Sequence, residues 1–276
     1  MKNVLITGCS SGYGHATALH FLERGWNVVA TMRTPGKGGL PASERLRELR
    51  LDVTDRASID AAVRAGIAAF DGIDVVVNNA GIGLFGAFEA TPEKTTREIF
   101  ETNTFGVMAV TQAVIPHFRA RRAGTLVNVT SSVGIVPMPL VAVYVASKLA
   151  VEGFTESLSY ELSCFGVRTK IVEPGYGPTT SFIANSGDRM NGTVPEPYAP
   201  YAQQLMGGMG AAKSTSALEV AQTVWLAATD GSARLRYAAG PDAEELAAMR
   251  RASPGEDYLE QMRAAMGPKS DPRGGG

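Results

Sequence analysis

The sequence predicts an α/β fold, in which one domain is built on a doubly wound parallel sheet with helices on both faces. Three observations predict this fold. Short runs of β-branched residues alternate with helix-length segments along the 276 residues. The runs are apolar on both faces instead of alternating with polar residues, which is typical of strands that helices cover on two sides. No internal repeat and no linker interrupts the pattern, so we expect a single domain with right-handed crossovers.

Six strands are expected from the positions of the apolar runs. In chain order they cover residues 4–6, 27–31, 50–53, 74–77, 125–129 and 168–172. Parallel strands need long crossover connections, so the segments between these runs are expected to be helices. In a sheet of this kind, ligands bind at the carboxyl ends of the strands, near the point where the strand order switches.

The helix after the third run has the clearest periodicity. Its apolar residues recur at spacings of four, four and three and so share one helical face, at Ile59, Val63, Ile67 and Phe70. Asp55 is placed to cap the amino end of this helix. A second helix start is predicted at Thr91, an N-cap residue that is followed by Pro92 in the first helical position.

The domain is expected to cover residues 1–266. Residues 177–215 are rich in Gly, Pro, Ser and Met and predict a mobile loop with short helices, which is a candidate lid over a substrate. Residues 267–276 are polar, end in three glycines and predict a flexible tail.

Composition excludes several classes of protein. Hydrophobic residues make up 45% of the chain and charged residues 19%, which provides for a buried core and argues against global disorder. The net charge of -1 gives no electrostatic reason to expect nucleic acid or an anionic membrane as a partner. No apolar run approaches the roughly 18 residues needed to span a bilayer. With two cysteines and no secretory signal, we expect a cytoplasmic protein without a disulfide framework.

A glycine-rich turn follows the first strand directly. Gly8, Gly12 and Gly14 have the spacing G-x-x-x-G-x-G, with Ser10, Ser11 and Tyr13 between them. Glycines at such a turn allow the backbone to approach a pyrophosphate, and the amino end of the following helix attracts negative charge. The spacing differs from the more usual G-x-G-x-x-G, and an ordinary strand-to-helix turn is the alternative. The position after the first strand favours a dinucleotide site.

The residue after the second strand predicts which dinucleotide binds. An acidic residue there would bind the ribose 2′-hydroxyl of NAD, but this chain has Met32 followed by Arg33. An arginine can pair with a 2′-phosphate through charge-assisted hydrogen bonds. The sequence therefore predicts NADP(H) in preference to NAD(H). The alternative is a solvated surface arginine.

Four polar residues are candidates for proton transfer. Tyr144 and Lys148 stand at i and i+4, on one face of a predicted helix. A nearby ammonium favours the phenolate, so we expect Lys148 to lower the pKa of Tyr144. Ser131 ends the fifth predicted strand, where its hydroxyl could bind a substrate carbonyl, and Ser132 competes for this role. Asn103 lies in a predicted helical stretch, residues 99–113, although Asn is a poor helix former.

Together these residues resemble the short-chain dehydrogenases/reductases. The resemblance covers residues 2–240 and keeps the motifs in order and spacing, at the glycine turn, residues 78–81, Asn103, Ser131, Tyr144-x-x-x-Lys148 and Pro174-Gly175. It implies a single-domain Rossmann fold and hydride transfer at a carbonyl or alcohol. Arg33 and residues 234–243 resemble NADPH-preferring carbonyl reductases of the steroid and retinoid type.

The resemblance also implies a role for each residue. Tyr144 would be the general acid–base, Lys148 would lower its pKa and hold the nicotinamide ribose, and Ser131, by its spacing from Gly124 and Tyr144, would orient the substrate oxygen. Asn103 would anchor a water molecule. Asp52 and Val53 would contact the adenine, and Asn79 and Gly81 the ribose on the adenine side. The nicotinamide carboxamide and diphosphate would be held by Pro174, Gly175, Gly177 and Thr179, although Gly177 stands where the family usually has an aliphatic residue.

The sequence thus predicts an NADP(H)-dependent oxidoreductase that acts on a ketone or secondary alcohol. Apolar candidates for the substrate pocket suggest a hydrophobic substrate, namely Leu84, Phe85, Met138, Pro139, Tyr176, Phe182 and Ile183. The alternatives are an NADP(H)-binding sensor without chemistry, a C=C reductase of the enoyl type, or an epimerase on the same fold. Scattered histidines predict no metal site. The amphipathic stretches 95–121 and 142–163 are expected to pair in a homodimer or homotetramer, as the resemblance implies.

Overall fold

The computed structural model describes residues 1–178, 187–209, 213–253, 255 and 257–268. Within these residues the strands form one seven-stranded sheet in the order β3-β2-β1-β4-β5-β6-β7, and every neighbouring pair is parallel. The strands are β1 (Asn3–Thr7), β2 (Asn27–Met32), β3 (Leu46–Arg50), β4 (Val75–Asn78), β5 (Gly124–Val129), β6 (Val167–Pro174) and β7 (Arg236–Ala239). The predicted doubly wound parallel sheet is therefore confirmed, and its order reverses between β1 and β4.

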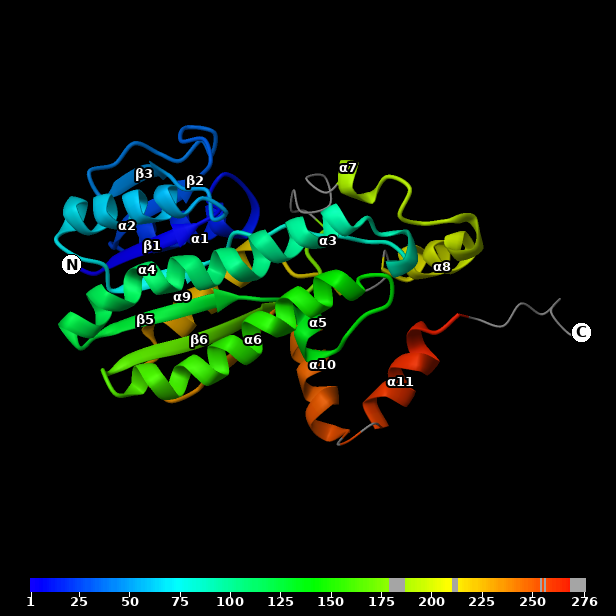
Figure 1. Ribbon diagram of the computed structural model, residues 1–276. Coiled ribbons are helices and arrows are strands. Elements are labelled where there is room, and N and C mark those ends of the chain that lie inside the picture. Colours follow the sequence, from blue (N-terminus) through cyan, green and yellow to red (C-terminus); the bar gives the residue numbers. More distant parts are fainter. Residues whose placement is uncertain (179–186, 210–212, 254, 256, 269–276) are drawn as a thin grey trace, which may run out of the picture.

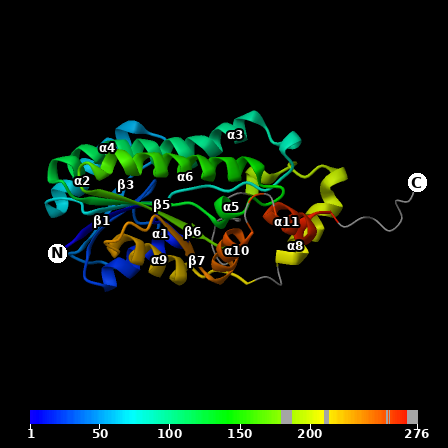
Figure 2. The ribbon, with the colours of Figure 1, turned by 90° about the horizontal axis from the view of Figure 1, so that it is seen from below.

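Helices cover both faces of the sheet. The longer ones are α1 (Gly12–Glu23), α2 (Arg56–Phe70), α4 (Gly106–Arg121), α6 (Ala142–Ser163) and α9 (Ala217–Thr229). Figure 2 shows α1 and α9 on one face of the sheet and α2, α4 and α6 on the other. The β-branched strands thus have a hydrophobic core on each side, which explains why they carry no polar alternation.

The third strand was predicted in the wrong place. Residues 50–53 overlap β3 only at Arg50, because the strand runs over the sequence Leu-Arg-Glu-Leu-Arg of Leu46–Arg50. β3 lies at the edge of the sheet and is only partly buried, so its sequence is largely polar. Its conformation comes from pairing with β2 instead of from its own hydrophobic pattern. Asp52 and Val53 consequently lie just beyond the carboxyl end of the strand.

The carboxyl-terminal part contains elements that the sequence analysis did not predict. β7 adds a further strand next to β6, and α10 (Pro241–Ala252) and α11 (Asp257–Met266) follow it. α11 ends where the flexible tail was expected to begin. The Gln204 amide donates to the Gly267 carbonyl at 2.9 Å, and the Tyr201 hydroxyl donates to the Met266 carbonyl at 2.8 Å. The chain at Gly267 is therefore bound to α8 (Ala199–Met209).

Short helices surround the carboxyl edge of the sheet. Figure 1 shows α7 (Gly187–Met190), α8, α10 and α11 grouped beyond the ends of the strands. The remaining short elements of the described residues are the 3-10 helices Phe88–Ala90 and Glu196–Tyr198, α3 (Glu93–Phe100), the π-helix η2 (Glu101–Phe105) and α5 (Ser132–Ile135). In the part of the chain that is described, none of the helices has the length and apolarity needed to cross a bilayer.

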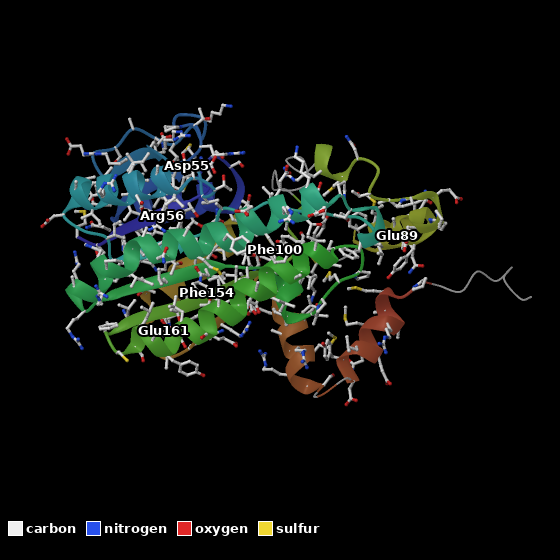
Figure 3. The ribbon with its side chains drawn as sticks, in the orientation of Figure 1. Asp55, Arg56, Glu89, Phe100, Phe154 and Glu161 are labelled. Carbon is white, nitrogen blue, oxygen red and sulfur yellow. The ribbon has the colours of Figure 1, made fainter. Side chains whose placement is uncertain are left out.

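The start of α2 is capped as its sequence predicts. The Asp55 carboxylate accepts a hydrogen bond of 3.2 Å from the backbone N–H of Ser58, and Figure 3 labels Asp55 and Arg56 at this end of the helix. The predicted cap of α3 was off by one residue. Pro92 is the N-cap and Glu93 begins the helix, because the Thr91 hydroxyl donates back to the Ala87 carbonyl at 3.0 Å.

We expect Asp55→Ala to lower the free energy of unfolding by about 1 kcal/mol, since the substitution leaves an amide of the first turn without its acceptor. Urea denaturation followed by circular dichroism measures this loss. Asp60→Ala is the matched control, because Asp60 lies on the same helix and forms an i,i+4 pair with Arg56 at the surface. Equal losses in the two variants would contradict a capping role for Asp55.

Candidate active site

The glycine turn brings backbone unusually close to backbone. A Cβ on Gly14 would lie 2.3 Å from the Gly8 carbonyl oxygen, and one on Gly8 would lie 2.9 Å from the Ala80 Cα. Gly8 and Gly12 also have φ angles of +76° and +58°, which residues with a side chain rarely adopt. Close packing therefore requires glycine at positions 8 and 14, and the backbone conformation requires it at positions 8 and 12.

The amino end of α1 is open to an anion. Its N-cap, Ser11, makes no side-chain capping bond, and no acidic residue stands in the first turn. The first N–H groups of the helix thus keep their hydrogen-bonding capacity and the positive end of the helix dipole. Gly8, Ser10, Ser11, Gly12 and Tyr13 all line the large cavity at this edge of the sheet, whereas Gly14 is buried and does not line it. A tight turn of small residues at a free helix end fits a pyrophosphate.

Asn79 makes hydrogen bonds to the glycine turn that the sequence analysis did not foresee. Its amide nitrogen donates to the carbonyls of Thr7 and Gly8, at 2.9 and 3.3 Å, and its backbone N–H donates to the Thr7 hydroxyl at 3.0 Å. The side chain of Asn79, directly after β4, therefore holds the glycine turn in place. Asn79 and Gly81 both line the cavity. The predicted contact with a ribose would be made by the atoms that they expose to the cavity.

Arg33 lies at the carboxyl end of β2, exposed and on the rim of the cavity. Asp52 and Val53, the residues predicted to contact an adenine, also line the cavity. Asp52 has a lowered pKa, because the hydrogen bonds from Thr54 and the charges of Arg33 and Arg50 outweigh its partial burial. The cavity also reaches Lys37, a second cation that the sequence analysis did not single out.

Tyr144 and Lys148 lie one turn apart on α6 and are both buried, with exposed fractions of 8% and 6%. The Lys148 ammonium is 5.8 Å from the centroid of the Tyr144 ring and donates to the Val129 carbonyl at 3.1 Å. The Ser131 and Tyr144 side chains share a hydrogen bond. Strand β5 ends at Val129, so Ser131 does not end the strand as predicted and is instead the N-cap of α5.

Ser131 and Ser132 differ in their surroundings. The Ser131 hydroxyl accepts from the Val133 N–H at 3.3 Å and bonds to the Tyr144 phenol. Ser132 is the first residue of α5 and is buried. Both line the cavity, but the bond to Tyr144 distinguishes Ser131.

The expected fall in the pKa of Tyr144 is not found. Burial raises the pKa of Tyr144 to about 12, and the hydrogen bond with Ser131 opposes this only in part. Burial also lowers the pKa of Lys148 to about 8, while the negative charge of Glu152 opposes that change. Both shifts have one cause, because removing water disfavours the charged form of each group. The lysine that was expected to acidify the phenol is itself less readily charged.

Asn103 interrupts the helix that was predicted over residues 99–113. It lies in η2, a π-helical turn between α3 and α4. Its amide oxygen accepts from the Ile82 N–H at 2.8 Å, and its nitrogen donates to the Ile82 carbonyl at 2.9 Å and to the Ser147 hydroxyl at 3.1 Å. Fully buried, Asn103 does not line the cavity and ties the loop after β4 to α6.

The cavity is large and continuous, with a volume of about 2160 Å³. This exceeds the ~300–1,000 Å³ of most small-ligand sites and leaves room for a substrate beside a dinucleotide. Pro174, the last residue of β6, lines it together with Gly175 and Gly177, whereas Thr179 lies outside the described residues. The expected substrate residues that line it are Leu84, Phe85, Met138, Pro139 and Tyr176. Phe182 and Ile183 lie outside the described residues as well.

The wall that faces away from the sheet is rich in methionine. Six methionines from α5 onward line the cavity, namely Met138, Met190, Met206, Met249, Met262 and Met266. The sequence analysis missed most of them, because α8, α10 and α11 are distant in sequence and only the fold brings them together. Methionine is flexible and adapts to apolar ligands of different shape.

Asp242 at the start of α10 is a further residue that the sequence analysis missed. Its carboxylate accepts from the Tyr176 N–H at 2.6 Å and from the Thr215 hydroxyl at 2.5 Å. Asp242 thereby connects the loop after β6, at Tyr176, to the residue that lies two positions before α9, Thr215. No three potential metal ligands of the His, Cys, Asp or Glu type gather anywhere in the described part of the chain.

Comparison with known proteins gives one consistent result. A model of the short chain dehydrogenase family matches residues 2–189. An uncharacterized oxidoreductase of Bacillus subtilis, YusZ, is 39% identical over 215 residues, which are 73% of this chain and 74% of that protein. The 3-ketodihydrosphingosine reductase of Bacteroides thetaiotaomicron is 38% identical over 172 residues, 62% of each chain.

Solved structures agree with this result over nearly the whole chain. A short-chain dehydrogenase from Streptomyces avermitilis superposes with a TM-score of 0.78 at 31% identity, covering 97% of this chain and 98% of the other. A 3-ketoacyl-(acyl-carrier-protein) reductase from Brucella melitensis, complexed with NADH, has a TM-score of 0.71 at 26% identity and covers 86% of this chain and 96% of its own. ElxO with NADP bound has a TM-score of 0.71 at 27% identity, covering 86% and 97%.

Proposed function

Because the chain belongs to the short-chain dehydrogenase family and is an oxidoreductase of alcohols or ketones with a nicotinamide cofactor, we propose a more specific function. The protein prefers NADP(H) to NAD(H), and its substrate is a hydrophobic ketone or secondary alcohol. The hydrogen-bonded pair of Ser131 and Tyr144, buried beside Lys148 in the cavity, carries this proposal. One related structure contains NADH and another contains NADP, so the cofactor preference of this chain has to be inferred from its own residues.

The residues at the dinucleotide end support NADP(H). No acidic side chain stands directly after β2, where it would repel a 2′-phosphate, and Arg33 offers a cation on the cavity rim. Lys37 lies on the same rim and adds a second positive charge. A guanidinium presents paired N–H groups that match phosphate oxygens, so Arg33 is the stronger determinant of the two.

In ketone reduction, Tyr144 would donate its proton to the developing alkoxide. A bound nicotinamide would supply the hydride. The high pKa of Tyr144 keeps the phenol protonated before the reaction, which suits a proton donor. Ser131 would give a second hydrogen bond to the substrate oxygen, and a charged Lys148 would stabilise the phenolate that remains. Asn103 would hold the loop after β4 and α6 at a fixed separation.

The apolar wall supports a hydrophobic substrate. Leu84, Phe85 and Met138 line the cavity together with the methionines of α7, α8, α10 and α11. Burying apolar substrate surface there contributes roughly 25 cal/mol per Å². The name of the Bacteroides relative specifies a ketone substrate, which supports the same chemistry for this chain.

A panel of apolar and polar ketones, assayed for NADPH consumption alongside NADPH affinity, tests the proposed function. We expect turnover of bulky apolar ketones, and the products should be the corresponding alcohols. Tight NADPH binding with no turnover on any ketone would indicate a sensor instead. Saturated carbonyl products from enones would indicate a C=C reductase, and products epimerised without net consumption of NADPH would indicate an epimerase.

We expect Ser131→Ala to lower kcat by about 10²–10³-fold, because a hydrogen bond to the developing oxyanion is lost. Ser132→Ala should have a much smaller effect, since Ser132 has no bond to Tyr144 of the kind that Ser131 makes. Steady-state kinetics of both variants with the best ketone measures the difference. The reverse order of effects would assign the role to Ser132.

A further inference from the structure

A cluster of four charged residues lies behind the Tyr144–Lys148 pair. Arg236 on β7 binds Glu152 and Glu173 through one guanidinium nitrogen, at 2.7 Å each, and Glu156 through another at 2.8 Å. Glu152 and Glu156 lie on α6, and Glu173 lies on β6. We call these residues the Arg236 cluster. The Arg236 cluster joins α6, which carries Tyr144 and Lys148, to the edge strand β7.

The Arg236 cluster has more negative than positive charge, and part of it is buried. The Glu152 and Glu173 side chains are 3% and 4% exposed, whereas the Glu156 side chain is 50% exposed. One arginine cannot neutralise three carboxylates, and the effect shows at Glu173. Burial raises the pKa of Glu173 to about 7, the charge of Glu152 adds to this rise, and Arg236 opposes it. Of the two buried carboxylates, Glu152 is the one that lies on α6, the helix that carries Tyr144 and Lys148.

The two oxygens of Glu152 have unequal surroundings. Oε2 accepts from Arg236, whereas Oε1 is buried without a hydrogen-bond partner among the described residues. The α5 backbone closes over this oxygen, because a Cβ on Gly134 would lie 1.9 Å from Oε1. The carboxylate is thus held between Arg236 and the same short helix whose N-cap is Ser131. Such a costly arrangement of a buried carboxylate requires a compensating positive charge nearby.

Lys148 is the cation one helical turn before Glu152 on α6. The two residues stand at i and i+4 on one face of α6, and the negative charge of Glu152 opposes the fall in the pKa of Lys148. The Tyr144 ring is also near Lys148, with its centroid 5.8 Å from the ammonium nitrogen. The elements η2 and α5 bring the neutral side chains Asn103 and Ser131 to this region. Arg236, Glu173 and Glu156 lie on the far side of Glu152.

We propose that Glu152 is a positioning residue for the catalytic pair, and that its carboxylate, fixed by Arg236 one helical turn beyond Lys148, keeps the Lys148 ammonium charged in its buried site. The effect of Glu152 on turnover rests on the proposed function, since it requires that Lys148 assists Tyr144. The effect of Glu152 on the charge of Lys148 is independent of the proposed function. Removing the charge of Glu152 makes the ammonium less favourable, so Lys148 loses its proton at a lower pH than in the wild type.

Glu152→Gln tests the proposal with little change of shape. In the protein without cofactor, ¹³C NMR of the lysine Cε atoms follows the titration of Lys148 directly, and Lys148→Met identifies its signal among those of the seven lysines. We expect the midpoint of Lys148 to fall by roughly one pH unit in Glu152→Gln. The limb of the kcat/KM profile that reflects Lys148 should move by the same amount.

Two further variants separate charge from structure. Glu156→Gln removes an exposed partner of the same arginine and should leave the midpoint unchanged. Glu152→Asp keeps the charge but withdraws it by one methylene, so its midpoint should fall between those of the wild type and Glu152→Gln. If Glu152→Gln does not fold, the fall in Glu152→Asp tests the proposal by itself.

An unchanged Lys148 midpoint in folded Glu152→Gln, or in Glu152→Asp where that variant alone folds, overturns the proposal. An equal shift in Glu156→Gln overturns it as well, since the effect would then come from the whole Arg236 cluster. The titration needs neither substrate nor turnover. Failure of the ketone panel would therefore refute the proposed function without affecting this result, and an unmoved midpoint would leave the proposed function standing.

Discussion

Tyr144→Phe should lower kcat by about 10²–10⁴-fold on the best ketone and leave NADPH affinity nearly unchanged. The phenylalanine ring fills the same buried space on α6 but has no proton to donate and no hydroxyl to bond with Ser131. The loss should therefore be in the chemical step. Single-turnover kinetics measures that step, and fluorescence titration measures the dissociation constant of NADPH.

Tyr160→Phe is the control for this prediction. It makes the same change on the same helix, at a side chain that is 78% exposed, and should have wild-type kinetics. Full activity in Tyr144→Phe would show that another group donates the proton, and the assignment of the pair would fail. A joint loss of NADPH binding and turnover would point to a structural role for the tyrosine.

Arg33→Gln should weaken NADPH binding by roughly 10- to 100-fold and leave NADH binding unchanged. A hydrogen bond to a charged group contributes about 1.5–3 kcal/mol, and each ~1.4 kcal/mol is a factor of ten in affinity. Arg33 is exposed, so added salt should reduce the difference. Titration of the protein with each cofactor, at low and at high ionic strength, measures both effects.

Arg50→Gln is the matched control, because Arg50 carries the same charge near Asp52 but does not line the cavity. We expect its affinities for both cofactors to equal those of the wild type. Similar wild-type affinities for NADPH and NADH would contradict the preference itself. If the wild type prefers NADPH and Arg33→Gln still prefers it to the same degree, Lys37 is the next candidate for the residue that binds the 2′-phosphate.

Most of the sheet could be predicted because its strands satisfy their own physical requirements. β1, β2, β4 and β5 are buried on both faces, so selection for burial leaves continuous apolar runs in the sequence. β3 and β7 lie at the two edges and escape this requirement. β3 was predicted a few residues too late and β7 was missed, because pairing with a neighbouring strand stabilises them more than their own composition does.

The residues of the candidate site could be predicted in part, for a similar reason. The glycine turn, Tyr144 with Lys148, and Arg33 are each local patterns whose chemistry depends on short spacings along the chain. The direction of the Tyr144 pKa could not be predicted, because burial depends on what packs around α6. The same holds for Asn79, whose amide reaches back to residues more than seventy positions earlier.

The sequence by itself determined the parallel α/β architecture, the glycine turn after β1 and the order of the polar residues, because periodicity and short spacings encode these features directly. Only the tertiary structure decided which distant groups meet. It placed the methionines of α8, α10 and α11 over one cavity and brought Arg236 to Glu152 across 84 positions. Burial and long-range charge depend on distances in space, which the linear pattern of residues does not contain.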